Sequence, residues 1–272
     1  MNHHLRISCL LAFMLLACSL PAQTPSTASK SRLAEILRLP ALQPADWKDL
    51  FALAGSGDPE AQYWLGSIYS AGRLLPLDKQ KAAYWFQKSA DQGYARAEFL
   101  LCGSRAGHDE LASERCLWAA AENGVPEAQF WLGVAFDQHL WFGVTDEAAA
   151  LKWFREAAEG GNADAQAELC KRYQTGEGVP VDFTRAAGWC RRAAEHVPDL
   201  GGASQGRNNL GILYEIGEGV PQDFVQAYKW LSLAGVKENL ARIEQDMTPE
   251  QISAGLKLAA EWKNQHPDPA IY

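Results

Sequence analysis

The sequence predicts an all-α fold of stacked helix pairs, and two observations carry that prediction. First, residues 169–189 and 210–230 follow nearly the same pattern, so that Trp189 and Trp230 occupy equivalent places. Self-similarity at a period of about 40 residues is typical of solenoids, in which each repeat buries its apolar side against the next. Second, apolar residues within each copy recur at helical spacing.

The first helix of each copy opens with a small residue and carries one apolar stripe. The four upstream openings are Ala61, Ala97, Ala128 and Ala165. In the first copy Ala61, Leu65 and Tyr69 fall four residues apart and so share one helix face. Gly72 follows at the point where a left-handed C-cap suits glycine.

The second helix of each copy is predicted from an aspartate that stands seven residues before a tryptophan. These aspartates are Asp78, Asp146, Asp182 and Asp223. Aspartate suits the N-cap because its carboxylate accepts hydrogen bonds from unpaired backbone N–H groups. The tryptophan then packs the second helix onto the first. Burial of one such ring should contribute several kcal/mol, since large-to-alanine core changes cost ~3–5 kcal/mol.

The shared pattern is A-x-x-x-L-G-x-x-Y-x-x-G-x-G-V-x-x-D-x-x-x-A-x-x-W, and it resembles the Sel-1-like repeat family, relatives of tetratricopeptide repeats. Five copies cover residues 57–235. The second copy, residues 97–118, departs most, with Arg105 at the aromatic place and no double-glycine turn. The resemblance implies a right-handed α-solenoid of antiparallel helix pairs, a tetratricopeptide-like superhelix. It also implies a scaffold or adaptor role in protein binding.

Both ends of the repeat array are expected to be capped by atypical helices, as solenoids require. Residues 23–30 read as a polar linker, and residues 31–56 as N-terminal capping helices. Residues 236–272 read as a degenerate closing pair. Within it, Thr248 and Gln251 form a capping box with proline at the first helical position.

Residues 1–22 are predicted to be an export signal. Residues 1–6 are basic, and residues 7–17 form an apolar core that is too short to span a bilayer. Two alternatives remain open: cleavage after Ala22 or, as in a bacterial lipobox, lipidation of Cys18. We therefore expect an exported protein with no membrane span after processing, located in the periplasm, on the outer membrane as a lipoprotein, or secreted.

The net charge and the cysteines limit the kinds of partner and cofactor that we expect. The formal charge of −8 argues against nucleic acid as a partner. Cys102 with Cys116, and Cys170 with Cys190, each lie within one expected hairpin, so they form either disulfides or small buried thiols. The sequence contains no Cys-x-x-Cys and no histidine pair at ligand spacing, so neither zinc nor another cofactor is expected.

Catalytic chemistry has little support in the sequence. Residues 202–206 match G-x-S-x-G around Ser204, but this motif acts only at a strand-to-helix elbow, and no strand is expected there. Cysteine-rich relatives in the repeat family have been linked to β-lactams, yet no Ser-x-x-Lys motif occurs. The histidines outside the signal, His108, His139, His196 and His266, are scattered. A hydrolase or β-lactam-handling enzyme is the alternative to a non-enzymatic role.

The function that the sequence favours is binding of a protein or peptide. Aromatic residues stand just before the leucine–glycine core of the first three copies, where the first helix of a tetratricopeptide-like pair lines the concave face. They are Tyr63, Trp64, Phe99, Phe130 and Trp131. Aromatic rings are favoured interface anchors, although rings on helices also serve to pack neighbouring repeats together. We expect an envelope adaptor or, alternatively, a secreted effector that binds a foreign protein.

Overall fold

The computed structural model describes residues 27–106, 110–138, 146–197 and 201–269, and these are helical with no strand among them. The helices are α1 (Thr27–Ile36), α2 (Pro44–Gly55), α3 (Pro59–Ala71), α4 (Lys79–Ala90), α5 (Ala95–Ala106), α6 (Glu110–Glu122), α7 (Pro126–Asp137), α8 (Glu147–Glu159), α9 (Ala163–Thr175), α10 (Phe183–Ala194), α11 (Gly201–Ile216), α12 (Phe224–Ala234), α13 (Lys237–Ile243) and α14 (Pro249–Gln265), with a 3-10 turn at Glu244–Asp246. The predicted α-solenoid of antiparallel helix pairs is confirmed.

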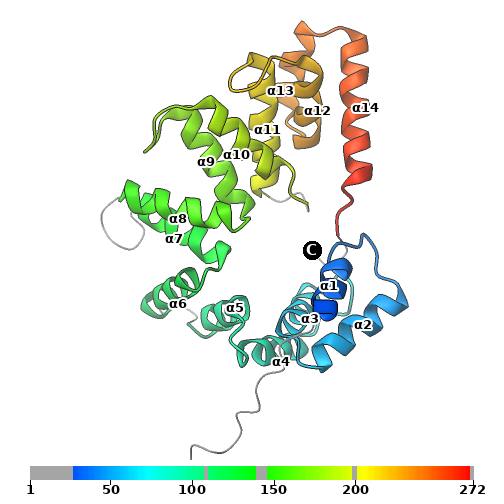
Figure 1. The fold of residues 1–272 in the computed structure, drawn as a ribbon, viewed down its shortest axis with the longest axis vertical. Helices are drawn as coiled ribbons and strands as arrows, with labels where there is room; N and C mark the ends of the chain where they lie inside the picture. The colour runs from blue at the N-terminus through cyan, green and yellow to red at the C-terminus, as the bar shows by residue number, and fades with distance from the viewer. Residues whose placement is uncertain (1–26, 107–109, 139–145, 198–200, 270–272) are drawn as a thin grey trace, which may run out of the picture.

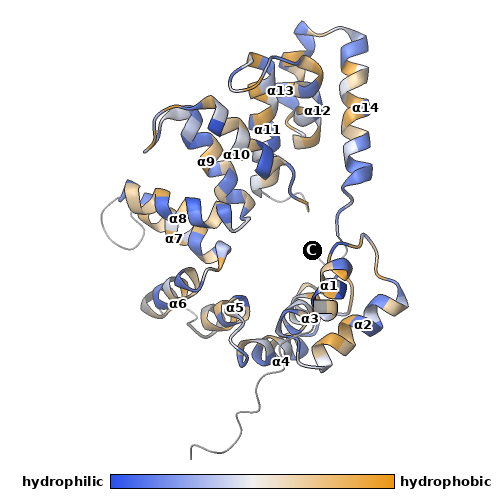
Figure 2. Cartoon of the chain, in the orientation of Figure 1, coloured by the Kyte–Doolittle hydropathy of each residue, from blue (hydrophilic) through white to orange (hydrophobic). Residues whose placement is uncertain are grey.

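The helix pairs follow one another around an arc, and the two ends of the arc return toward each other (Figure 1). Leu37, just after α1, and His266, just after α14, line one cavity of about 500 Å³. Each helix carries both apolar and polar residues, so each has a side that packs and a side that faces water (Figure 2). Within the described ranges, the helices lack the combined length and apolar character needed to cross a bilayer.

The predicted aspartate caps are present in four of the hairpins. Asp78 accepts a hydrogen bond from the Lys81 amide at 2.9 Å, and Asp146, Asp182 and Asp223 cap their helices in the same way. Gly72 ends α3 in the left-handed region with φ 68°, which glycine adopts without strain. The turn chemistry predicted from the sequence is therefore the chemistry that the structure uses.

Close contact between the two helices of a pair depends on a glycine five residues after the opening small residue. A Cβ atom on Gly66 would lie 2.7 Å from the Phe86 ring, and one on Gly133 would lie 2.8 Å from the Phe154 ring. Gly211 approaches Leu231 in the same manner. In these three pairs the large residue follows the repeat tryptophan and fills the space that the glycine leaves.

The N-terminal cap differs from expectation at its start. Helix α1 begins at Thr27, so the second half of the expected 23–30 linker is helical. This stretch holds no proline or glycine to stop a helix, and α1 gains stability by burying Leu33 and Ile36 against the first pair. Arg32 holds α1 to α2 through Asp46 at 2.6 Å.

The C-terminal cap forms as predicted. Thr248 and Gln251 make the expected capping box at the start of α14, and the Trp262 ring lies 6.1 Å from that of Trp230. The expected signal at residues 1–22, with Cys18 and Ala22, lies outside the described residues, as do His108 and His139.

Candidate protein-interaction surface

The structure separates the five predicted contact aromatics into packed and exposed rings. Trp64 is only 8% exposed and belongs to the apolar cluster that α3 forms with α1 and α2. Tyr63 packs between the rings of Phe86 and Tyr94. The expected surface position therefore does not hold for Trp64, which belongs to the core.

The remaining three rings lie on α5 and α7. Phe99 is half-buried against the apolar cluster that joins α6 to α7, and Phe130 packs on Phe154 at 5.9 Å. Trp131 is different, since 55% of its surface is exposed. It is the one predicted contact ring that stands out from the packed helices.

Trp131 has an exposed apolar counterpart on the preceding pair. Leu100 stands at the equivalent place on α5 and is 42% exposed. One helical turn earlier on each helix, Arg96 and Glu127 join across the two pairs at 3.4 Å. Residues four apart lie on the same side of a helix, so Leu100 and Trp131 extend from that ion pair in one direction. We call these four residues the Trp131 surface.

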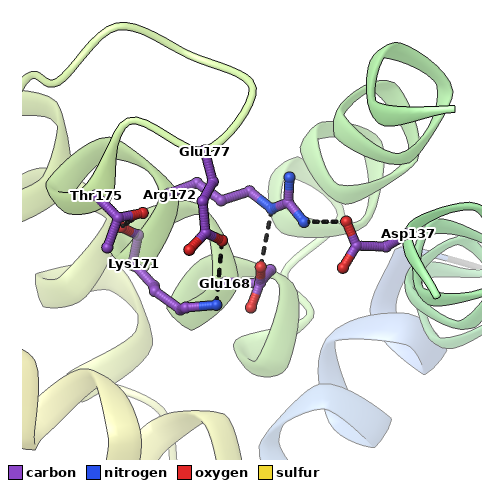
Figure 3. A network of polar contacts seen from close by, with 6 residues as sticks. All are labelled: Asp137, Glu168, Lys171, Arg172, Thr175 and Glu177. Atoms are coloured by element: carbon purple, nitrogen blue, oxygen red, sulfur yellow. Dashed lines mark hydrogen bonds and ion pairs between the residues drawn. The ribbon is translucent and has the colours of Figure 1, made fainter. Parts of the chain in front are cut away.

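The next pair replaces the apolar residue by a charge. Glu168 stands at the equivalent place on α9 and accepts a hydrogen bond from Arg172 Nε at 2.8 Å. Arg172 Nη2 also donates to Asp137 at the end of α7 at 2.5 Å (Figure 3). Beside it, Lys171 pairs with Glu177 at 3.2 Å.

Arg172 is an unusual core residue, since only 2% of it is exposed. Its guanidinium also lies over the Phe154 ring, 5.0 Å from the centroid. Burial, the largest single influence, opposes the charged form, but the hydrogen bonds and charges of Asp137 and Glu168 together outweigh it and raise the pKa of Arg172. This cluster joins the third and fourth pairs rather than forming a reaction centre, because its carboxylates are already engaged by the guanidinium.

A second contact between neighbouring pairs, which we call the glutamine joint, uses a buried glutamine. It was not predicted from the sequence. In three pairs the residue after the opening alanine is a buried glutamine whose side-chain amide donates to the carbonyl oxygen eight residues earlier. The bonds are Gln62 to Ala54 at 2.9 Å, Gln129 to Ala121 at 3.2 Å and Gln166 to Ala158 at 2.9 Å. In the fifth pair Arg207 donates to Ala194 at 2.9 Å instead. The recurring Ala-Gln dipeptide is the sequence feature from which these contacts could have been predicted.

Both predicted disulfides are present. Cys102 is bonded to Cys116 and Cys170 to Cys190, with Cα–Cα separations of 5.7 Å and 5.1 Å. These separations lie within the usual range for a disulfide. Cys170 and Cys190 occupy the two places that Gly133 and Phe154 occupy in the preceding pair, so a covalent bond replaces an apolar contact there.

The G-x-S-x-G string is part of α11 and not a loop. Ser204 donates its hydroxyl hydrogen bond to the Ala234 carbonyl at 3.1 Å. A Cβ on Gly202 would meet the Ala163 backbone at 2.3 Å, and one on Gly206 would meet Ala193 at 2.5 Å. The two glycines therefore permit close helix packing, and the strand-to-helix elbow that a serine nucleophile needs does not occur in this segment.

Metal ligation has no candidate among the residues that the structure places. No three His, Cys, Asp or Glu side chains gather there as a metal site requires. His196 lies after α10, and burial, with help from Arg192 and Arg207, lowers its pKa. The geometry thus offers a binding surface and structural joints.

Comparison with known proteins defines the family. The sequence pattern of the Sel1 repeat matches residues 59–94, 126–162, 163–196 and 204–235, and the chain belongs to the Sel1 repeat family. The matched segments contain the pairs α3–α4, α7–α8 and α9–α10, and the pair α11–α12 apart from the first three residues of α11. The pair α5–α6 lies between the first two.

Individual relatives agree in fold. A protective antigen of uropathogenic Escherichia coli with an SLR fold is 26% identical, with a TM-score of 0.50 over 82% of this chain and 56% of its own. An immunity protein of Pseudomonas aeruginosa is 21% identical, with a TM-score of 0.54 over 90% and 85%. Chitin synthase regulatory factor 3 of Schizosaccharomyces pombe is 32% identical over 42% of this chain and 13% of its own length, so this chain spans a small part of that relative.

Proposed function

We propose that this chain is a non-enzymatic interaction scaffold of the cell envelope and that a peptide or protein partner binds the Trp131 surface. The exposure of Trp131, at 55%, is the observation that carries this proposal. Tryptophan and arginine are the residues most enriched at binding hot spots, and burial of such a ring against a partner releases water from a large apolar area.

The surroundings of Trp131 support a directed contact. Leu100 extends the apolar area, and the Arg96–Glu127 pair at its edge supplies hydrogen-bonding groups of both signs. An apolar centre with a polar rim is the usual anatomy of a protein interface. The Gln129 joint holds α7 to α6, and the Arg172 cluster and the Gln166 joint hold the α7–α8 pair to α9. The surface is therefore presented on a supported frame.

The envelope location is supported by the two disulfides, because such bonds persist in oxidising compartments. Residues 1–22 then serve as the export signal, with the mature chain beginning after Ala22 or carrying lipid on Cys18. The mass of the mature N-terminus distinguishes these two products.

Affinity capture from an envelope extract tests the scaffold role. The immobilised full chain is compared with Trp131→Ser and with Tyr84→Ser, a matched control on α4 that is 54% exposed. A partner bound by the wild type and by Tyr84→Ser, and lost with Trp131→Ser, supports the proposal. Equal recovery of every captured protein by all three baits would refute the site.

A further inference from the structure

The pair α5–α6 leaves a cavity of about 640 Å³ against α4. Phe99, Leu101 and the Cys102–Cys116 disulfide are among the apolar groups that line it. A volume of this size lies within the range of about 300–1,000 Å³ that ligand-binding pockets occupy. Trp131 does not line it, so this site is separate from the Trp131 surface.

The cavity exists because a large side chain is missing from α6. In three other pairs the residue after the repeat tryptophan is large and fills the space between the helices; these residues are Phe86, Phe154 and Leu231. After Trp118 the residue is Ala119, which lines the cavity. The disulfide does not compensate, because Cys116 lies one turn earlier on α6.

A hydrogen-bond donor is missing at the same place. The glutamine of the joint is replaced by Glu98, whose carboxylate cannot donate to a carbonyl oxygen as Gln166 does to Ala158. Whereas Gln166 is 2% exposed, Glu98 is exposed. Both Glu98 and Ala90, the residue eight positions earlier, line the cavity.

The charges of the lining favour a cationic occupant. Asp91 and Glu98 contribute carboxylates, whereas Arg115 is the single cationic side chain in the lining. Asp91 already accepts a hydrogen bond from Gln87 at 2.6 Å. Glu98 is therefore the carboxylate best placed to meet an incoming cation beside the apolar lining residues.

We propose that this cavity binds a segment of a protein partner in which a lysine or arginine adjoins an aliphatic side chain. The cationic group pairs with the Glu98 carboxylate and supplies the donor that the glutamine supplies elsewhere. The aliphatic side chain fills the space that Ala119 leaves beside Phe99. The defective joint of the α5–α6 pair is thus completed by the partner.

Two labelled pentapeptides test the proposal, one of sequence Gly-Leu-Lys-Leu-Gly and one with glutamate in place of lysine. Their binding to the full oxidised chain is followed by fluorescence anisotropy up to millimolar concentration. We expect the lysine peptide to bind more tightly, and Glu98→Gln and Ala119→Phe each to weaken it roughly tenfold or more. Glu122→Gln on α6 serves as a control that leaves binding unchanged.

Circular dichroism checks that each variant is folded, and Glu98→Gln decides the question should Ala119→Phe not fold. The proposal is overturned by absence of binding of the lysine peptide, by equal binding of the two peptides, or by unchanged binding to Glu98→Gln. Because Trp131→Ser is scored separately, failure here and failure of the Trp131 surface are distinguishable.

Discussion

Gly133 lies directly against the ring of Phe154, so that a Cβ atom at Gly133 would stand 2.8 Å from a ring carbon. The same relationship joins Gly66 to Phe86. Real Cβ atoms do not approach other carbons so closely, and the surrounding helices are themselves tightly packed. The contact therefore fixes how near the two helices of a pair come to each other.

Replacement of Gly133 by alanine is expected to destabilise the fold by about 1–3 kcal/mol, because overpacking forces the Phe154 ring or the backbone to move. Gly188 on α10 is the matched control, since a Cβ there meets nothing within 4 Å. Gly188→Ala should be neutral or stabilise by about 0.5–1 kcal/mol. Urea unfolding of both variants measures the difference, and equal destabilisation would contradict the packing account.

Gln166→Glu is expected to weaken the joint between the third and fourth pairs. The carboxylate cannot donate to the Ala158 carbonyl, and Gln166 is almost wholly buried. Loss of the bond together with burial of a charge should cost at least about 1–3 kcal/mol at neutral pH. Gln205→Glu, at an exposed place on α11, should change the free energy of unfolding by less than about 0.5 kcal/mol. Similar effects of the two changes would count against the joint.

The role of the Cys170–Cys190 bond can be tested by replacing both cysteines. Conversion of both residues to alanine should cost about 3 kcal/mol, the value expected for closing a loop of this length. The double variant Cys170→Gly with Cys190→Phe recreates the pair of residues found at Gly133 and Phe154 and should recover part of that loss. Thermal unfolding under oxidising conditions compares the variants, and no recovery would show that the two places are not interchangeable.

His196 predicts a pH dependence near neutrality. Its folded pKa lies below the value of about 6.5 expected when unfolded, because burial and the neighbouring arginines Arg192 and Arg207 disfavour its charged form. As pH falls below about 6.5 the unfolded chain gains a proton that the folded chain does not, so stability declines. His196→Gln should flatten the change in urea midpoint between about pH 7.5 and pH 5.5. An unchanged slope would contradict the prediction.

The repeat framework was predictable from sequence because each of its residues acts locally. Asp78 caps the helix that it precedes, and Gly72 ends the helix that it follows. The exposure of the aromatic residues was not predictable in this way. Trp64 and Trp131 occupy equivalent places, yet only Trp64 lies within a buried apolar cluster, and no local pattern records which neighbours cover a side chain.

The cavity beside α5 could not be predicted from the sequence either. Ala119 and Glu98 are visible as departures from the repeat. Their meaning depends on the contacts of Phe86 with Gly66 and of Gln166 with Ala158, which join residues on different helices. Ser204 lies inside α11, and the neighbouring Gly202 and Gly206 serve helix packing. Their packing role depends on residues of α9 and α10.

Hydroxyl-radical footprinting of the chain, alone and with the captured partner, tests the central claim most directly. Oxidation of Trp131 and Leu100 should fall sharply in the complex, because both side chains become buried against the partner. Oxidation of Tyr84, which is equally exposed in the free chain, should stay the same. Unchanged oxidation of Trp131 in a saturated complex would contradict the assignment of this surface.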